Sequence, residues 1–147
     1  MMSQANEMTL RFPADARNEG FARMVICAFC LELHPTVSEL SDVKTAVSEA
    51  VTNAIVHGYE GSSGMVTLRA AIDDRSTLTV EVKDSGRGIA DVPKAMEPFF
   101  TTHPEQERSG MGFAVMQTFM DDVDVESAPG KGTIVRMSKR IHSGGGW

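Results

Sequence analysis

The sequence of 147 residues predicts an α+β fold, a two-layer α/β sandwich in which helices cover one face of a mixed, mainly antiparallel sheet. In several short segments apolar residues alternate with polar ones, which is typical of half-buried strands. In others they recur every three or four residues, as on amphipathic helices. The resulting order is strand, two helices, two strands, a long loop, one helix and two strands, which fits one sheet with helices on one side.

The N-terminal part of the chain supplies one strand and two helices. Residues 8–12 alternate between apolar and polar and predict the first strand. A helical pattern covers residues 18–33 and is stopped by a His-Pro pair. Thr36 and Glu39 have the spacing of a capping box, so we expect a second helix that begins there and ends near Gly58.

The rest of the chain alternates strands with one long irregular stretch. The expected elements are a β-hairpin of residues 65–72 and 78–82, a loop over 84–112 with a short helix near 93–96, a helix over 112–120, and closing strands over 123–125 and 133–137. A loop of that length inside a small domain is either functional or disordered.

Composition and charge limit the classes of function. The 14 Lys and Arg residues and 20 Asp and Glu residues leave a net charge of −6, which argues against nucleic-acid binding, because that needs clustered cations. The length fits one domain, residues 1–142, followed by a flexible glycine-rich tail, 143–147. We find no signal peptide and no apolar stretch that would span a membrane, so we expect a cytoplasmic protein.

Cys27 and Cys30 form a C-x-x-C pair within an apolar helical run. A redox pair of this kind normally opens a helix after a strand, and a zinc site needs further ligands. His34 is placed to complete a three-ligand face, so a metal site is the alternative. We expect two buried thiols.

Three polar segments need an explanation beyond packing. Glu49 and Asn53 lie four residues apart and therefore share a helix face, where a carboxylate and an amide suit magnesium or proton transfer; a solvated polar stripe would look the same. Residues 84–89 place an Asp and two glycines directly after a strand, although a tight turn would explain them too. Residues 107–113 form an Arg- and Gly-rich helix start that suits phosphate, or simply close packing.

In this order the three segments resemble the N box and the two glycine boxes of the ATPases and kinases that include DNA gyrase, Hsp90, bacterial histidine kinases and MutL. A closer similarity, over residues 6–140, is to the sporulation anti-sigma factors, which are serine protein kinases. The stretches that carry it are residues 18–23, 48–59, 98–102 and 107–113. The resemblance implies the Bergerat-type ATP-binding fold.

The resemblance also implies a role for each motif residue, with ATP and Mg²⁺ as cofactors. Glu49 would be the general base, and Asn53 would bind the magnesium ion that bridges the phosphates. Asp84, assisted by Thr133, would bind the adenine amino group. The residues implied to contact or surround the rest of the nucleotide are Gly86, Gly88, Thr101, Thr102, Arg108, Ser109, Gly110, Met111 and Gly112.

Some positions depart from the family or stay open. His103 stands where a Lys commonly follows the two threonines, and Ile134 replaces a second Thr. His57 is typical of the family; a packing or helix-end role and a ligand role are both open. Arg23 would contact protein partners.

The implied function is an anti-sigma factor that inhibits a sporulation sigma factor in its ATP form and phosphorylates a serine of an anti-anti-sigma factor. The implied assembly is a homodimer, formed through the first strand and helix with their Met and Phe side chains. Two alternatives are a general-stress anti-sigma kinase of the same family and a non-catalytic, ATP-dependent binding module. Neither nucleic acid nor a membrane is an expected partner.

Overall fold

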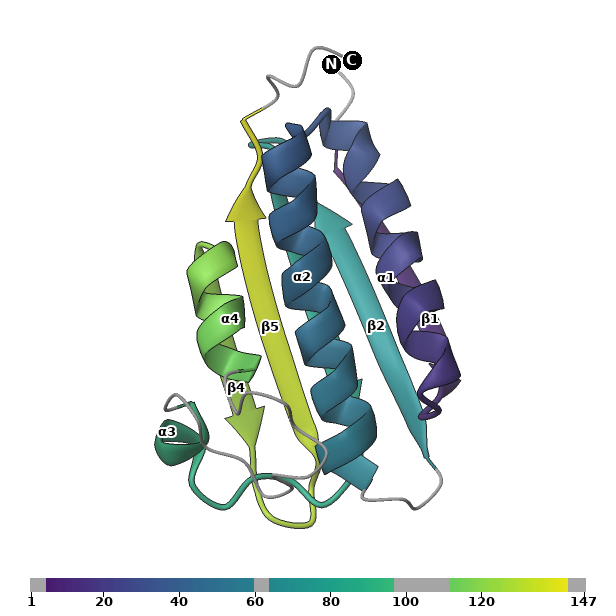
Figure 1. Cartoon of the computed structure of the whole chain (residues 1–147), viewed down its shortest axis with the longest axis vertical. Helices are drawn as coiled ribbons and strands as arrows, with labels where there is room; N and C mark the ends of the chain where they lie inside the picture. Colours follow the sequence, from purple (N-terminus) through teal and green to yellow (C-terminus); the bar gives the residue numbers. More distant parts are fainter. Residues whose placement is uncertain (1–4, 60–63, 97–111, 143–147) are drawn as a thin grey trace.

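One antiparallel sheet and the helices on one of its faces make up the described part of the chain (Figure 1). The computed structural model describes residues 5–59, 64–96 and 112–142. Its strands are β1 (Asn6–Pro13), β2 (Met65–Ile72), β3 (Thr77–Asp84), β4 (Asp122–Ser127) and β5 (Thr133–Arg140), in the spatial order β1-β2-β3-β5-β4. The predicted two-layer α+β architecture is confirmed.

All four described strand pairings are antiparallel, whereas we expected a mixed sheet. Two helices, α1 and α2, separate β1 from β2, so the chain reverses three times and β2 returns antiparallel to β1. β4 does run in the same direction as β3, but β5 inserts between them and pairs antiparallel with both. β3 and β4 therefore run parallel, but they are not hydrogen-bonded to each other.

The first two helices begin and end close to where the sequence places them. α1 (Arg17–Cys30) continues into a 3₁₀ turn, η1 (Leu31–Leu33). α2 (Val37–Asn53) starts with the predicted capping box: the N–H of Glu39 donates to Thr36 Oγ1 at 3.0 Å, and the N–H of Thr36 donates to Glu39 Oε1 at 2.9 Å. Both exchanges satisfy backbone donors that a helix start leaves unpaired.

The C-terminal end of α2 differs from the regular helix that the sequence predicts. It continues as a π-helix, η2 (Ala54–Gly58). Single-turn π segments occur often at functional sites, because the extra residue per turn changes the direction of the following side chains and carbonyls. The remaining helices among the described residues are the short α3 (Val92–Ala95) and α4 (Gly112–Phe119).

The hydrophobic core lies between the sheet and α1, α2 and α4 (Figure 1). Alternate residues of the central strands are buried against the helices, which is the expected period of two. The buried apolar residues of β2, β3 and β5 are Val66, Leu68, Ala70, Ile72, Leu78, Val80, Val82, Val135 and Met137. The opposite sheet face carries ion pairs, such as Arg136 with Glu81 at 3.2 Å. One face of the sheet is thus buried against the helices, and the other faces solvent.

The cysteines are free thiols, as expected, but only Cys30 is fully buried, while Cys27 is half-buried. Burial raises the pKa of the Cys30 thiol to about 12. Within the described ranges, no group of three or more His, Cys, Asp or Glu side chains is placed to hold a metal ion. The structure therefore gives no support to a metal site at Cys27, Cys30 and His34.

Two further expectations concern surfaces. On α1, Phe21 and Met24 are well exposed, at 58% and 61%, whereas Phe12 of β1 is buried in the core. The Phe of the first strand therefore does not belong to an exposed face, whereas Phe21 and Met24 of α1 do. Among the residues that the structure describes, no helix has the length and apolar character needed to cross a bilayer.

Candidate functional site

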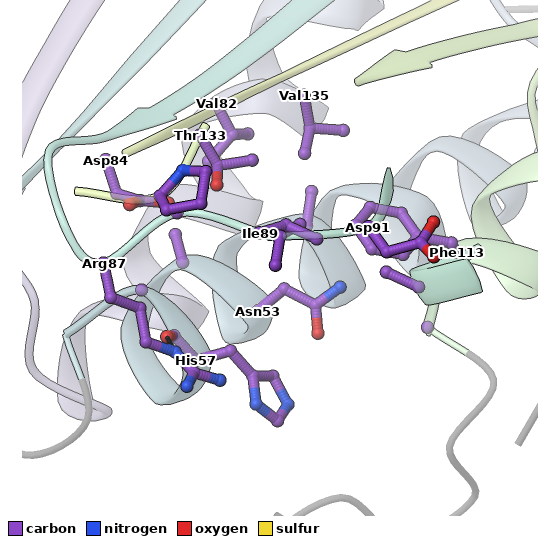
Figure 2. A pocket seen from close by; sticks show the side chains of 18 of the residues that line it. Asn53, His57, Val82, Asp84, Arg87, Ile89, Asp91, Phe113, Thr133 and Val135 are labelled. Carbon is purple, nitrogen blue, oxygen red and sulfur yellow. Dashed lines mark hydrogen bonds between the residues drawn. The ribbon is translucent and has the colours of Figure 1, made fainter. Parts of the chain in front are cut away.

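A cavity of about 480 Å³ opens between the end of α2 and η2, the loop after β3, and the start of α4 (Figure 2). Its lining residues are Ala50, Asn53, Ala54, His57, Gly58, Val82, Asp84, Arg87, Gly88, Ile89, Ala90, Asp91, Lys94, Ala95, Gly112, Phe113, Pro129, Thr133 and Val135. The wall is mostly apolar with a few polar groups, which is typical of a small-molecule site.

Asp84, the last residue of β3, lies at one end of this cavity. It is 5% exposed, and its Oδ1 accepts a 2.9 Å hydrogen bond from the N–H of Gly86. Burial raises the pKa of this carboxyl, and backbone hydrogen bonds from Gly86 and Thr133 only partly oppose the effect. The protein thus leaves the ionised carboxylate under-solvated, and a ligand that brings hydrogen-bond donors would stabilise it.

Glycines allow the loop after β3 to approach the end of η2 closely. A Cβ at Gly58 would lie 2.8 Å from Asp84 Cγ, and a Cβ at Gly86 would collide with the carbonyl oxygen of Gly58. Gly86 is therefore required by backbone contact, and Gly58 by contact with the Asp84 side chain. Gly58, which the sequence suggested only as a helix stop, sets the position of Asp84.

Arg87 fastens the same loop to the helix end. Its backbone N–H donates to the carbonyl oxygen of Gly58 at 2.8 Å, and its Nε donates to the carbonyl oxygen of His57 at 2.9 Å. A cation that binds the last carbonyls of a helix caps it and interacts favourably with the helix dipole. The side chain of His57 lines the cavity beside Arg87 (Figure 2), so its carbonyl has a helix-end role while its ring faces the site.

Glu49 and Asn53 lie where α4 begins. A Cβ at Gly112 would lie 3.0 Å from Asn53 Nδ2 and 3.4 Å from Glu49 Oε2, so the glycine keeps space beside both side chains. The start of α4 is close to this pair, and a helix N-terminus attracts anions. A carboxylate, an amide and a helix N-terminus therefore meet at this edge of the cavity.

Thr133, at the start of β5, is the register partner of Asp84 and lines the cavity next to it (Figure 2). Its Oγ1 lies 2.8 Å from Ser127 Oγ. Ser127 also accepts a hydrogen bond from the N–H of Ile89 at 2.8 Å and donates one to the carbonyl oxygen of Gly132 at 2.9 Å. The hydroxyls thus connect β4, β5 and the loop after β3.

The structure brings together most of the described residues that the sequence singled out. Those that line the cavity are Asn53, Asp84, Gly88, Gly112 and Thr133. The N–H of Gly86 donates to the Asp84 carboxylate, and Glu49 lies beside Gly112. Arg23 is on α1, where it forms an ion pair of 3.6 Å with Glu19. Predicted residues outside the described ranges are Thr101, Thr102, His103, Arg108, Ser109, Gly110, Met111 and the tail 143–147.

Sequence reasoning missed Ser127, Arg87 and Lys94 as residues of this region. Ser127 resembles an ordinary turn residue before the Pro-Gly pair. Arg87 lies between the two glycines of residues 84–89, which drew attention to the glycines and not to the Arg. Only Arg87 gave a usable signal, since a cation between two glycines after a strand is well placed to cap a neighbouring helix.

Comparison with known proteins agrees with this geometry. Residues 12–139 match the family model of the histidine kinase-like ATPase domain. An anti-sigma F factor of Thermoanaerobacter sp. strain X514 is 56% identical over 142 residues, which cover 97% of this chain and 99% of the relative. Another, from Caldanaerobacter subterraneus subsp. tengcongensis, is 58% identical over 140 residues, or 95% of this chain and 97% of the relative.

Solved structures share the fold at lower identity. The RsbU and RsbW domains of a Mycobacterium tuberculosis protein align with a TM-score of 0.68 at 18% identity, over 92% of this chain and 32% of that one. The histidine kinase domain of a blue-light activated kinase from Erythrobacter litoralis aligns with a TM-score of 0.57 at 22% identity, over 84% of this chain and 61% of that one. The chain therefore belongs to the histidine kinase-like ATPase family and, within it, to the anti-sigma F factors.

Proposed function

We propose that the chain is an anti-sigma factor that binds ATP, holds a sporulation sigma factor inactive in the ATP form, and phosphorylates a serine of an anti-anti-sigma factor. Near full-length relatives named anti-sigma F factor support this assignment. The observation that carries the catalytic part is the position of Glu49 and Asn53 at the cavity edge where α4 begins.

The cavity orients the nucleotide by the chemistry of its two ends. The base would lie beside Asp84 and Thr133, where the carboxylate accepts a hydrogen bond from the amino group of adenine. The phosphates would then extend toward Asn53 and the start of α4, where the helix N-terminus favours negative charge. Apolar residues between the two ends, such as Ile89 and Val135, would contact the nucleoside.

Asn53 is the residue that would hold Mg²⁺, which when bound supplies charge neutralisation between the phosphates. Magnesium typically takes few protein ligands and completes its shell with phosphate oxygens and water, so one amide oxygen beside an anion site fits this ion. The space that Gly112 leaves next to Asn53 fits as well.

Glu49 would act as general base for the transfer. As the serine Oγ of the substrate attacks the γ-phosphorus, its hydroxyl proton passes to the Glu49 carboxylate. The new Oγ–P bond forms while the bond from the γ-phosphorus to the bridging oxygen breaks, and ADP leaves. Such reactions depend mainly on positioning and charge stabilisation, which this chain would provide through Asn53, Arg108 and the start of α4.

The protein partners would bind through Arg23 on α1. Its side chain is half-buried, and within the described chain its Nε has no hydrogen-bond partner. The side chain as a whole is 32% exposed, so an acidic group of a partner can reach it. The exposed Phe21 and Met24 lie on the same helix and would support the homodimer.

Transfer of radiolabelled phosphate from ATP to the cognate anti-anti-sigma protein tests this function. The wild type should label a serine of that protein, and Glu49→Gln should lower the rate by about 100-fold or more. Asp42→Asn is a matched control, since Asp42 lies on the same helix but pairs with Lys139 at 3.6 Å, away from the cavity. No transfer by the wild type, or full transfer by Glu49→Gln, would contradict the proposal.

A further inference from the structure

The Ser127 hydroxyl, at the end of β4, is surrounded by hydrogen-bonding groups that the proposed reaction does not use. The N–H of Ile89 donates to it at 2.8 Å, it donates to the Gly132 carbonyl oxygen at 2.9 Å, and Thr133 Oγ1 lies 2.8 Å away. These three groups come from the loop after β3, the β4–β5 turn and the start of β5.

The hydrogens of this cluster can be assigned by counting. A serine hydroxyl has one hydrogen and two lone pairs. The Gly132 carbonyl only accepts, so it takes the hydrogen of Ser127, and the Ile89 N–H takes one lone pair. The remaining lone pair faces Thr133 Oγ1, which must therefore be the donor of the bond that joins the two hydroxyls. The opposite assignment would deprive the Gly132 carbonyl of this donor.

The direction of this bond decides what Thr133 offers to a ligand. Its single hydrogen points to Ser127, so toward the cavity Thr133 can only accept. Asp84, its register partner on β3, also accepts through its carboxylate (Figure 2). This end of the cavity therefore combines two acceptor side chains.

We propose that Ser127 is a positioning residue that holds the Thr133 hydroxyl as an acceptor and thereby makes the cavity select a 6-aminopurine over a 6-oxopurine nucleotide. The inference rests on the proposed binding of ATP. A 6-amino group brings two hydrogens for the two acceptors. A 6-oxopurine brings the single hydrogen on N1 and sets its carbonyl oxygen against the remaining acceptor in a desolvated site. Sites built around hydrogen bonds reject a ligand that leaves their buried groups unpaired.

The experiment compares ATP with inosine triphosphate, which carries the 6-oxo group. Equilibrium Kd values for both, measured on the full chain by calorimetry, give a discrimination ratio, Kd of inosine triphosphate over Kd of ATP. In Ser127→Ala the Thr133 hydroxyl is free to rotate and donate to a 6-oxo group, so the ratio should fall about 5- to 10-fold. Ser127→Thr keeps the hydroxyl and should retain the wild-type ratio.

A double-mutant cycle isolates the effect of Ser127 on Thr133. In a Thr133→Val background, Ser127→Ala should change the ratio by less than about twofold, because no hydroxyl remains to be oriented. Ser138→Ala is a matched control. Ser138 also lies in β5, but Val135 and Met137 are buried on the helix-covered face, and strand side chains alternate, so Ser138 belongs to the opposite face. It should leave the ratio unchanged.

The outcomes separate this inference from the proposed function. An unchanged ratio in Ser127→Ala with ATP binding intact, or an equal effect of Ser127→Ala with and without Thr133, would overturn only the role of Ser127. Failure of the wild type to bind either nucleotide would overturn the proposed function and this inference with it. If Ser127→Ala does not fold, Thr133→Val alone decides: the ratio should fall, and an unchanged ratio would overturn the inference.

Discussion

Two buried carboxylates, near the opposite ends of α2, show how differently this chain treats the same chemical group. Glu39, in the first turn, is 9% exposed, and Asp84, against the end of η2, is 5% exposed. Burial pushes the pKa of Glu39 up, but hydrogen bonds from Thr36 and from the N–H of His142 outweigh it, so this pKa lies below its usual range. Burial prevails at Asp84, whose pKa is raised.

The difference indicates that the start of α2 stabilises the fold, whereas the end of η2 forms part of the ligand site. At the capping end the protein itself satisfies the carboxylate, and the bond from His142 also ties the segment after β5 to the start of α2. At the cavity end the hydrogen bonds to Asp84 do not compensate for its burial. Functional sites commonly sacrifice stability in this way, because the missing interactions are supplied by the ligand.

The largest effect should come from Gly88→Ala at the cavity end. Gly88 has φ +76°, and a Cβ there would collide with the carbonyl oxygen of Ala128. Left-handed strain and overpacking together should cost about 3 kcal/mol in unfolding free energy and weaken ATP binding. Urea denaturation and nucleotide titration measure the two effects.

Gly130→Ala is the matched control for that substitution. Gly130 has the same φ of +76°, but a Cβ there meets nothing within 4 Å. It should cost only about 1–2 kcal/mol, from backbone strain alone. Equal costs for the two substitutions would show that the contact with Ala128 does not constrain the cavity loop.

Glu39→Ala should have the next largest effect, and at the capping end alone. Loss of the bonds that the Glu39 carboxylate accepts from the N–H groups of Thr36 and His142 should lower the unfolding free energy by about 1–2 kcal/mol. The Kd for ATP should stay within about twofold of the wild type, because a substitution far from a site normally has little effect on it. A large loss of ATP affinity in a folded Glu39→Ala protein would break the separation of the two ends.

Arg87→Met should have a smaller effect, because only one of the two contacts of Arg87 with the helix end is lost. The bond from Nε to the His57 carbonyl disappears, while the backbone bond to Gly58 remains. We expect ATP affinity to fall about threefold, as for the loss of one modest hydrogen bond. Arg75→Met, in the β2–β3 turn, should change nothing, and an equal effect of both substitutions would exclude the capping role.

The subtlest expectation concerns pH, where the two carboxylates should act with opposite sign. Since the pKa of Glu39 is lowered from 4.5, its stabilising contribution is full above that value and is lost as the pH falls below it. Since the pKa of Asp84 is raised from 3.8, the folded chain holds that proton longer, and stability falls as the pH rises through the raised pKa. Relative to the wild type, Glu39→Gln should lose stability and Asp84→Asn should gain it as the pH rises. Unfolding curves between about pH 3 and 7 test this, and slopes of the same sign would contradict it.

Local signals in the sequence predict much of the fold. The Thr36 and Glu39 capping box and the β2–β3 hairpin depend on residues close together in the chain, so spacing alone reveals them. The insertion of β5 between β3 and β4 is a long-range choice, and alternation in each strand is the same whichever neighbour it pairs with. The sequence therefore predicts a mixed, mainly antiparallel sheet, whereas all four described pairings are antiparallel.

The site was predicted to a similar extent and for similar reasons. Asn53, Asp84 and Thr133 follow from motifs whose order resembles a known family, and all three line the cavity. The π-helical end of α2 and the hydroxyl pair of Ser127 and Thr133 depend on tertiary packing, so no local sequence pattern predicts them. The positions of Thr101 and of 108–111 stay predictions, since they lie outside the described residues.

The most direct test of the account is an ATP titration of the wild type and of Asp84→Asn at neutral pH in the presence of Mg²⁺. We predict saturable binding by the wild type and a loss of about 10- to 100-fold in affinity for Asp84→Asn, the range for a hydrogen bond to a charged group. Unfolding of the same samples should show that the variant is at least as stable as the wild type. Absence of ATP binding by the wild type, or equal affinity in the folded variant, would contradict the claim that the cavity beside Asp84 is the nucleotide site.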